Sequence, residues 1–195
     1  MFVHPALQEL YLNHHRKPKE LWISNLTFCP RREYFSYHLP TVRKFTDTAL
    51  AGILLHRLIQ EQLCKEGYII EERIEYDIGN GWKIVGRVDA LKLDHLVEIK
   101  TTLDYSKELQ DHWISQANLY AYILNLSKFI IIVVERPTGY YQRFEFETNK
   151  EKAEELIDLA KTVRDCIVNR VLPKGRIDWC LKFCEFSIFC KEMMS

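Results

Sequence analysis

The sequence has no excess of charge of either sign, because its 195 residues contain 27 Lys and Arg against 27 Asp and Glu. Net charge therefore gives no support to a strongly basic nucleic-acid-binding protein, and a DNA-binding surface would need a local cluster of basic residues. The pairs Arg31-Arg32 and Arg43-Lys44 are candidates for such a cluster. Solvated surface charge explains these pairs equally well.

Long hydrophobic runs are also lacking. The longest, Phe129 to Val134, has the length of a β-strand and is too short for a helix that spans a bilayer. The N-terminus does not have the basic-then-apolar order of a signal peptide, so we expect a cytoplasmic protein without a membrane partner. The chain has no G-x-x-x-x-G-K-S/T phosphate loop and no G-x-S-x-G elbow, which argues against a helicase and an acyl-transfer enzyme.

Hydrophobic residues make up 47 % of the chain, which is enough to build a core and excludes wholesale disorder. The length fits one domain over residues 1–195. Hydrophobic spacing predicts helices over residues 3–16, 24–37, 48–66, 106–126 and 151–170, and strands over residues 68–77, 82–93, 96–101, 129–135 and 140–147. Thr148 is the expected cap of the last helix. This order predicts an α/β (α+β) fold with helices around one central mixed sheet.

Three charged residues, Asp89, Glu98 and Lys100, stand in segments that otherwise have the composition of buried strands. Burying charge there is costly unless the charges pair or bind a metal. Alternation places Glu98 and Lys100 on one face of their strand, and the turn at Asp94-His95 can bring Asp89 beside Glu98. Two converging carboxylates suit Mg²⁺ or Mn²⁺. A salt bridge between Lys100 and either carboxylate is the simpler alternative.

Six cysteines in a chain expected to be cytoplasmic favour metal or redox chemistry over disulfides. Four of them have a one-plus-three layout, in which Cys29 is followed about 150 residues later by Cys180, Cys184 and Cys190. Four thiolates can hold a structural Zn²⁺ or a cubane iron–sulfur cluster. Zinc sites usually present two close pairs of ligands, so this layout is not that of a zinc finger. A metal bound by all four would clamp the N-terminal segment onto the C-terminal tail.

Four motifs occur in a fixed order: Gly52-x-x-x-His56, Gly86-Arg87-Val88-Asp89, Glu98-Ile99-Lys100 and Gln116-x-x-x-Tyr120. In these motifs, and from Ser24 to Cys190, the sequence resembles the RecB-type branch of the PD-(D/E)xK nuclease superfamily, and above all the CRISPR-associated protein-four family. The resemblance implies a restriction-endonuclease-like core. It implies that Lys100, Glu98 and Asp89 are catalytic. The implied ligands of the divalent ion, Mg²⁺ or Mn²⁺, are His56, Asp89, Glu98 and the carbonyl of Ile99.

The resemblance also assigns two residues of the last motif. It implies that Gln116 and Tyr120, one turn apart on a helix, line the DNA side of the site. Ordinary helix polarity with a core aromatic is the alternative. Arg31 and Arg32 are the other expected DNA contacts.

The iron–sulfur proteins of this family have the same one-plus-three layout of cysteines. The resemblance therefore implies a 4Fe-4S cluster in a subdomain of residues 20–40 and 171–195, with the ligands Cys29, Cys180, Cys184 and Cys190. The usual triplet is C-x-x-C-x-x-x-x-x-C, whereas three residues separate Cys180 from Cys184 here. A different cluster type, zinc and free thiols are the alternatives.

The implied activity is that of a metal-dependent exonuclease on single-stranded DNA ends. Such an enzyme processes prespacers in CRISPR adaptation, beside integrase proteins. One alternative is an iron–sulfur subunit of an integrase complex that reads a DNA end or motif and cleaves little, which the balanced charge favours slightly. Another is a virus-borne, stand-alone copy of the nuclease, with the same chemistry.

Overall fold

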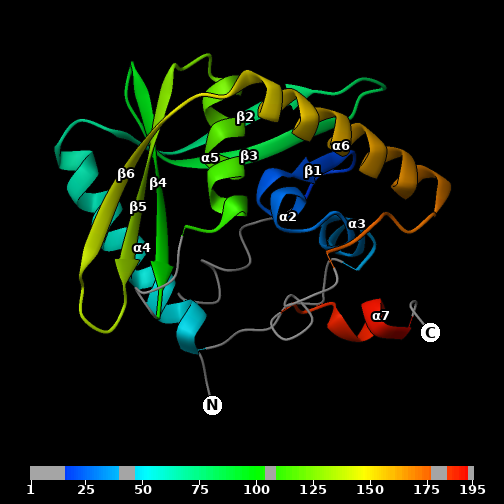
Figure 1. The fold of residues 1–195 in the computed structure, drawn as a ribbon, viewed down its shortest axis with the longest axis horizontal. Coiled ribbons are helices and arrows are strands. Elements are labelled where there is room, and N and C mark those ends of the chain that lie inside the picture. The colour runs from blue at the N-terminus through cyan, green and yellow to red at the C-terminus, as the bar shows by residue number, and fades with distance from the viewer. Residues whose placement is uncertain (1–15, 40–46, 104–108, 177–183, 193–195) are drawn as a thin grey trace.

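A computed structural model of the chain describes residues 16–39, 47–103, 109–176 and 184–192 (Figure 1). The helix expected over residues 3–16, apart from its last residue, lies outside these ranges, as do Arg43, Lys44 and Cys180. The strands are β1 (Glu20–Trp22), β2 (Ile69–Asp77), β3 (Lys83–Leu91), β4 (His95–Thr102), β5 (Lys128–Glu135) and β6 (Tyr141–Glu147). The helices are α2 (Ile23–Phe28), α3 (Pro30–His38), α4 (Asp47–Lys65), α5 (Asp111–Ile123), α6 (Lys150–Asn169) and α7 (Ser187–Glu192).

Strand β3 organises a six-stranded mixed sheet. One of its edges pairs antiparallel with β2 along the strand. The other edge is shared, because residues 83–85 pair in parallel with β1 while Ala90 and Leu91 pair antiparallel with β4. Strand β5 continues the sheet parallel to β4, and β6 runs antiparallel to β5. Between its two partners on the shared edge, from Gly86 to Asp89, β3 has no paired strand among the described residues, so the sheet forks there.

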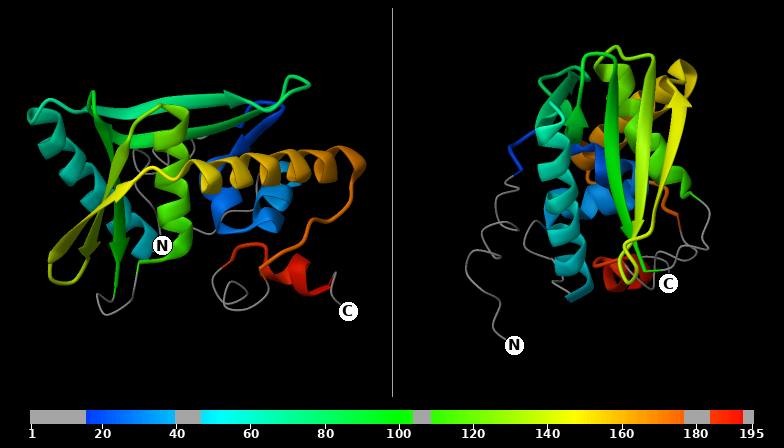
Figure 2. Two further views of the ribbon diagram at one scale, coloured as in Figure 1. Left: turned by 45° about the horizontal axis from the view of Figure 1, so that its top comes forward. Right: turned by 90° about the vertical axis from the view of Figure 1, so that its left-hand side faces the viewer.

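Helices cover both faces of the sheet, as the right-hand view of Figure 2 shows. Helix α4 packs on one face, over a cluster of Leu63, Ala90, Val97, Ile99 and Ile130. Helices α5 and α6 cover the other face, over a larger core that includes Leu96, Leu119, Phe129, Ile131 and Val163. The expected mixed α/β architecture, with a central mixed sheet flanked by helices, is confirmed. No helix within the described ranges is long and apolar enough to cross a membrane.

Three local features differ from the expectation. Strand β1 was not expected, because three residues are too few to show alternation, and it forms by pairing with β3. The helix expected over residues 24–37 is divided into α2 and α3 at Cys29, whose backbone is extended with φ −167°. Asn149, not Thr148, caps α6, because Asn149 Oδ1 accepts a 2.9 Å hydrogen bond from the backbone N–H of Lys152. The hydroxyl of Thr148 donates instead to the carbonyl of Leu126.

The C-terminal segment packs against α3. The ring of Phe35 on α3 stacks on that of Phe186, with centroids 5.8 Å apart, and contacts Phe189 of α7 at 6.1 Å. Phe35 and Phe186 are both buried. Two segments that lie at opposite ends of the sequence therefore share one hydrophobic contact (Figure 1).

Candidate active site and metal centre

The candidate site lies where β3 and β4 part. Their ladder contains two pairs only, Ala90 with Val97 and Leu91 with Leu96. Beyond these pairs, the carboxylate of Asp89 replaces a backbone partner, since its Oδ2 accepts a 2.6 Å hydrogen bond from the N–H of Ile99. Asp89 is 8 % exposed, so a buried charge occupies the fork of the sheet.

Helix α4 brings a histidine to this fork. A Cβ atom at Gly52 would lie 2.9 Å from Oγ1 of Thr101 on β4, so glycine allows the helix to approach the strand closely. His56 follows one turn later on the same helix face. Its Nε2 is 3.0 Å from Oδ2 of Asp89. The close approach of α4 to β4 at Gly52 is therefore a physical reason for a glycine four residues before the histidine.

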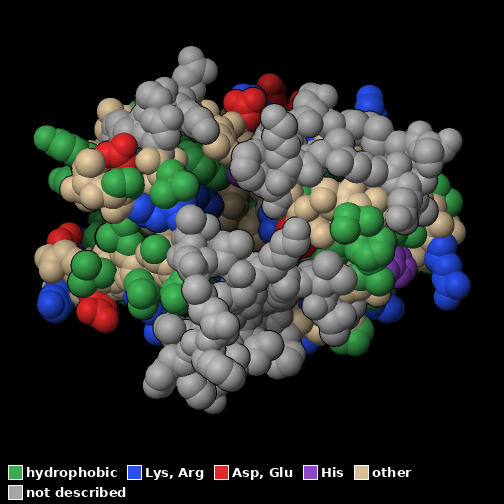
Figure 3. All heavy atoms as spheres, turned by 90° about the horizontal axis from the view of Figure 1, so that it is seen from below, with side chains coloured by type: hydrophobic (Ala, Val, Ile, Leu, Met, Phe, Trp, Pro, Cys, Tyr) green, Lys and Arg blue, Asp and Glu red, His purple; other side chains and the backbone are tan. Residues whose placement is uncertain are grey.

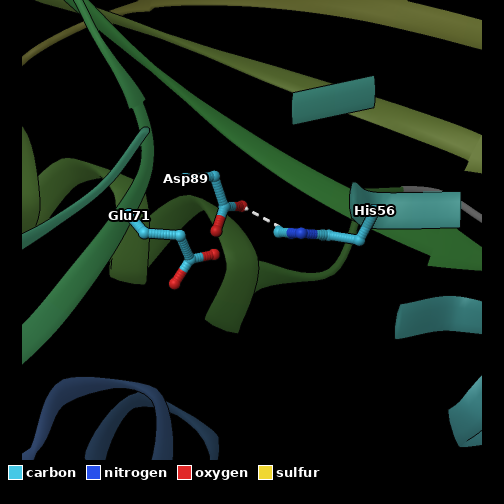
Figure 4. A group of neighbouring side chains, drawn as sticks. All are labelled: His56, Glu71 and Asp89. Carbon is cyan, nitrogen blue, oxygen red and sulfur yellow. Dashed lines mark ion pairs between the residues drawn. The ribbon is translucent and has the colours of Figure 1, made fainter. Parts of the chain in front are cut away.

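A glutamate of β2, which belongs to none of the four sequence motifs, joins the same group. Figure 4 shows Glu71, Asp89 and His56 pointing toward one another from β2, β3 and α4. One ligand atom from each of the three lies within 4.8 Å of the other two. Within the described residues, these are the side chains close enough together to form a metal-binding group, and Glu98 is not among them. The hint in the sequence is weak, because a glutamate in an alternating strand usually faces solvent.

Glu98 makes its contacts on the side of α5. Its Oε1 accepts hydrogen bonds from Lys100 Nζ at 2.7 Å and from Gln116 Nε2 at 2.8 Å. Lys100 also donates to Gln116 Oε1 at 3.0 Å, and Gln116 donates to the hydroxyl of Tyr120 at 3.0 Å. The ring of Tyr120 packs so closely on β3 that a Cβ at Gly86 would lie 2.4 Å from its Cε1. The ring of Tyr120, in one motif, therefore leaves room only for a glycine at position 86, in another motif.

The charges of the site shift the pKa values of two of its members. Burial lowers the pKa of His56, but the charges of Asp89, Glu98 and Glu71 outweigh burial and raise it to about 9. Burial and the charge of Asp89 raise the pKa of Glu98 to about 7, against the opposing effect of Lys100. The imidazolium of His56 therefore supplies a positive charge that offsets the negative charges of the surrounding carboxylates.

The residues present fit a hard divalent cation. Oε2 of Glu98 is buried and has no hydrogen-bond partner in the described part of the chain, although burying an unpaired carboxylate oxygen is unfavourable. Carboxylate oxygens with one imidazole nitrogen are ligands that Mg²⁺ and Mn²⁺ accept. The side chains of His56, Glu71 and Asp89 are close enough together to hold such an ion. Glu98, with Lys100 beside it, offers a further carboxylate oxygen that has no partner within the described residues.

Two of the residues expected to contact DNA lie beneath the site. Gln116 is 7 % exposed and Tyr120 is 2 % exposed, and both bond to neighbouring protein groups. Burial raises the pKa of Tyr120 well above its usual value, so its hydroxyl stays neutral. Their position favours support of Glu98 and Lys100 over direct contact with a nucleic acid.

The two arginines expected to contact DNA both bond to the C-terminal segment. Arg31 donates from Nε to the carbonyl of Pro173 at 2.9 Å, and Arg32 pairs with Glu185 at 3.1 Å. Arg32 also lies over the ring of Phe28 at 4.7 Å. Two adjacent arginines at the start of a helix are typical of a charged surface, and nothing in their sequence shows that a distant tail covers them.

Positive charge nevertheless gathers near the site. Burial, with the charges of Lys100, Arg176 and Arg32, lowers the pKa of His112 to about 4. This histidine packs edge-on against Phe28 with centroids 5.2 Å apart. Figure 3 shows Lys and Arg side chains beside a hollow on the face seen from below. Several basic side chains therefore act on His112 at the start of α5, although the chain as a whole has no net charge.

Three of the four cysteines expected to bind a cluster line one small cavity. Cys29, Cys184 and Cys190 surround it together with Arg31, Phe35 and Phe186, among others. Arg31 Nη1 lies 3.5 Å from Sγ of Cys190. The fourth, Cys180, lies outside the described residues. The donor set of three thiols fits a thiolate-bound metal, and the cavity between them is small.

Comparisons with known proteins bear directly on this geometry. No family model matches the chain. Over 200 residues the chain is 27 % identical to the CRISPR-associated exonuclease Cas4 of Saccharolobus solfataricus, and the match covers 96 % of this chain and 95 % of that protein. The chain is homologous to an exonuclease.

Solved structures agree with this relationship at the level of the fold. SSO0001 matches with a TM-score of 0.81 at 22 % identity, over 95 % of this chain and 93 % of its own. The alkaline exonuclease LHK-Exo of Laribacter hongkongensis matches with a TM-score of 0.61 at 12 % identity, over 78 % of this chain and 89 % of its own. The chain therefore shares its fold with an exonuclease.

Proposed function

We propose that this protein is a divalent-metal-dependent deoxyribonuclease of the RecB-like, restriction-endonuclease-like type, which shortens single-stranded DNA from an end. The observation that carries the proposal is the contact of His56 with Asp89 at the fork between β3 and β4, next to the pair of Glu98 and Lys100 on β4. Each comes from one of the ordered motifs. The orphaned oxygen of Glu98 supports a cation as the missing partner.

The ion, Mg²⁺ or Mn²⁺, supplies Lewis-acid chemistry when bound, because it neutralises phosphate charge and lowers the pKa of water. Its ligands would be His56, Asp89, Glu98 and the carbonyl of Ile99. Lys100 uses two of its three N–H donors on Glu98 and Gln116, so within the described residues one donor is left to orient a water or a phosphate oxygen. Gln116 bonds to both Glu98 and Lys100 and so holds these two side chains together.

The relatives support a role in DNA metabolism. The Saccharolobus solfataricus relative is a CRISPR-associated exonuclease, and LHK-Exo matches this fold in a complex with dAMP at a TM-score of 0.60. We propose that the protein works in the cytoplasm, where it processes prespacers beside integrase proteins. A virus-borne copy would perform the same chemistry elsewhere.

We also propose that Cys29, Cys180, Cys184 and Cys190 bind a 4Fe-4S cluster in a subdomain of residues 20–40 and 171–195, within one domain. The convergence of three of these cysteines on one cavity supports this assignment. The hydrogen bond from Arg31 toward Cys190 would then stabilise the negative charge of the thiolates.

A second candidate is a subunit that reads a DNA end and cleaves little. The balanced charge of the chain favours it, because a free-standing nuclease gains affinity from basic residues. Arg31 and Arg32 both bond to the C-terminal segment, which leaves fewer of their donors for phosphate and points the same way.

Digestion of end-labelled single-stranded DNA in Mn²⁺ separates the two candidates. The wild type, purified without oxygen, is compared with Lys100→Ala and with Lys161→Ala, an exposed lysine on α6. We expect the wild type and Lys161→Ala to shorten the strand and Lys100→Ala to leave it intact. Binding without cleavage by all three proteins would support the end-reading subunit. Equal cleavage by Lys100→Ala would remove Lys100 from the catalytic set.

A further inference from the structure

Glu71 occupies an unusual place in β2. The β2–β3 ladder pairs Ile70 with Ala90 and Glu72 with Val88, but the intervening residues, Glu71 and Asp89, are not paired. Glu71 has φ +58°, in the left-handed region, within a strand. This conformation costs about 1–2 kcal/mol for a residue with a Cβ. The β2–β3 ladder is therefore interrupted directly opposite Asp89, and the interruption costs conformational free energy.

A buried amide holds Glu71 in this position. Gln60 on α4 is 5 % exposed. Its Nε2 donates to Oε1 of Glu71 at 2.6 Å and to the backbone carbonyl of Asp89 at 3.2 Å. Buried amides are rarely left without partners, and this one replaces the ladder bond that β2 does not supply. Because Gln60 lies one turn after His56, a single face of α4 fixes both side chains.

The ligand atoms of His56, Glu71 and Asp89 lie within 4.8 Å of one another, which is a spacing that one ion can bridge. An independent observation also points to an ion. The side chain of Glu98 is 3 % exposed, and its Oε2 has no partner among the described residues. Glu98 is next in sequence to Ile99, whose N–H donates to Oδ2 of Asp89, so the orphaned carboxylate belongs to the β4 residue beside this group.

We infer that Glu71 is a direct ligand of the divalent ion and that Gln60 is its positioning residue. The inference rests on the proposed function, which requires an ion at the fork, and it adds a ligand from β2 to those from α4, β3 and β4. An ion pair with Arg87, at 3.2 Å from Oε2, is the competing role for Glu71. The two roles can be separated by changing the length of the side chain at constant charge, because a metal ligand must place its oxygen at the ion.

Calorimetric titration with Mn²⁺ alone tests the inference without any measurement of cleavage. Glu71→Gln should weaken Mn²⁺ binding at least about tenfold, the effect typical of losing a group that supports a metal site. Glu72→Gln is the matched control, because Glu72 is the next residue on the same strand and is exposed. It should bind Mn²⁺ within about twofold of wild type. Wild-type affinity in Glu71→Gln would overturn the assignment.

Two further variants separate ligation from charge and from folding. Glu71→Asp keeps the charge but is one methylene shorter, so a ligand role predicts weaker binding; wild-type affinity here, with weak binding in Glu71→Gln, would reduce Glu71 to a remote charge. Gln60→Met should weaken binding in the wild type and have no effect in the Glu71→Gln background, since the two residues act as one unit. Equal effects in both backgrounds would give Gln60 a role independent of Glu71.

The outcome for Asp89→Asn distinguishes this inference from the proposed function. If the wild type binds Mn²⁺, Asp89→Asn does not, and Glu71→Gln binds as wild type, the metal centre stands and only the assignment of Glu71 fails. If the wild type binds no Mn²⁺, both the metal centre and the assignment fail. Circular dichroism of each variant confirms that the compared proteins are folded.

Discussion

The backbone N–H of Ile99 donates a 2.6 Å hydrogen bond to Oδ2 of Asp89. In an extended strand the N–H and C=O of one residue point to the same edge, so the carbonyl of Ile99 also faces β3. The same Asp89 oxygen lies 3.0 Å from Nε2 of His56. The carboxylate of Asp89 therefore connects β4 to α4 across the fork. Its charge is the largest of those that raise the pKa of His56.

Without divalent ions, the free energy of unfolding should fall as the pH rises from about 6.5 to about 9. Burial lowers the pKa of His56, and the charges around it, chiefly that of Asp89, raise it from 6.5 to about 9. A pKa raised on folding stabilises the fold below the unfolded pKa, and this stabilisation is lost as the pH rises through the folded pKa. At about 1.4 kcal/mol per pKa unit, the loss is about 2–3 kcal/mol. Glu98, whose pKa is raised from 4.5 to about 7, adds a loss of the same sign at lower pH.

Denaturant unfolding in the presence of a chelator, repeated across this pH range, measures the effect. Asp89→Asn is the control, because it keeps the shape of the side chain and removes the charge that His56 faces. Its unfolding free energy should change little between pH 6.5 and 9. Parallel curves for the two proteins would mean that His56 and Asp89 do not form an ion pair.

The sequence predicts much of the sheet and of the site, for identifiable reasons. Strand β5 is largely buried on both faces, so it is visible as a continuous hydrophobic run, and β4 is visible as a shorter segment with apolar residues at 96, 97 and 99. Glu98 and Lys100 stand out because charge is rare in such runs, and alternation alone predicts that they share a face. Their contact at 2.7 Å agrees with that prediction.

Other features depend on contacts that no local pattern encodes. Strand β1 exists because it pairs with β3 about sixty residues later. In the sequence, Glu71 resembles any exposed glutamate of an alternating strand. Its positive φ can be recognised only in the structure. Gln60 looks like an ordinary polar residue of a helix, although it is buried. Long-range packing decides the role of each of these residues.

Gly86→Ala should destabilise the protein by about 1–3 kcal/mol, because the new Cβ would overpack a filled position. That Cβ would lie 2.4 Å from Cε1 of Tyr120. The ring cannot move alone, since its hydroxyl accepts a hydrogen bond from Gln116, which holds Glu98 and Lys100. Cleavage should therefore fall together with stability, as measured by denaturant unfolding and by strand digestion.

A second substitution identifies the clash. In a Tyr120→Leu background, Gly86→Ala should cost less than about 1 kcal/mol, because the ring that it meets is gone. The difference between the two costs is the coupling energy of Gly86 and Tyr120. The same cost in both backgrounds would show that the glycine is required for another reason.

Cys184→Ser should lower the iron content of protein purified without oxygen, and should lower its Tm. Cys184 lines the same cavity as Cys29 and Cys190, so its loss removes one thiolate from the proposed cluster. Iron per chain and visible absorption are the measurements. Cys64→Ser serves as the control, since Cys64 is exposed on α4. Iron retained in Cys184→Ser at the level of Cys64→Ser would exclude Cys184 as a ligand.

Binding of Mn²⁺ at pH 8 should release about one proton per ion, because a histidine must lose its proton before it can ligate a metal. With a pKa of about 9, His56 is still mostly protonated at pH 8. Glu98, with a pKa of about 7, is already mostly ionised there, so the released proton comes from His56. Titrations in Hepes and in Tris, which differ in ionisation enthalpy, count the protons. The affinity should rise with pH and become constant above about pH 9. His56→Asn should bind more weakly and lose this dependence, whereas a wild-type affinity that does not change with pH would remove His56 from the ligand set.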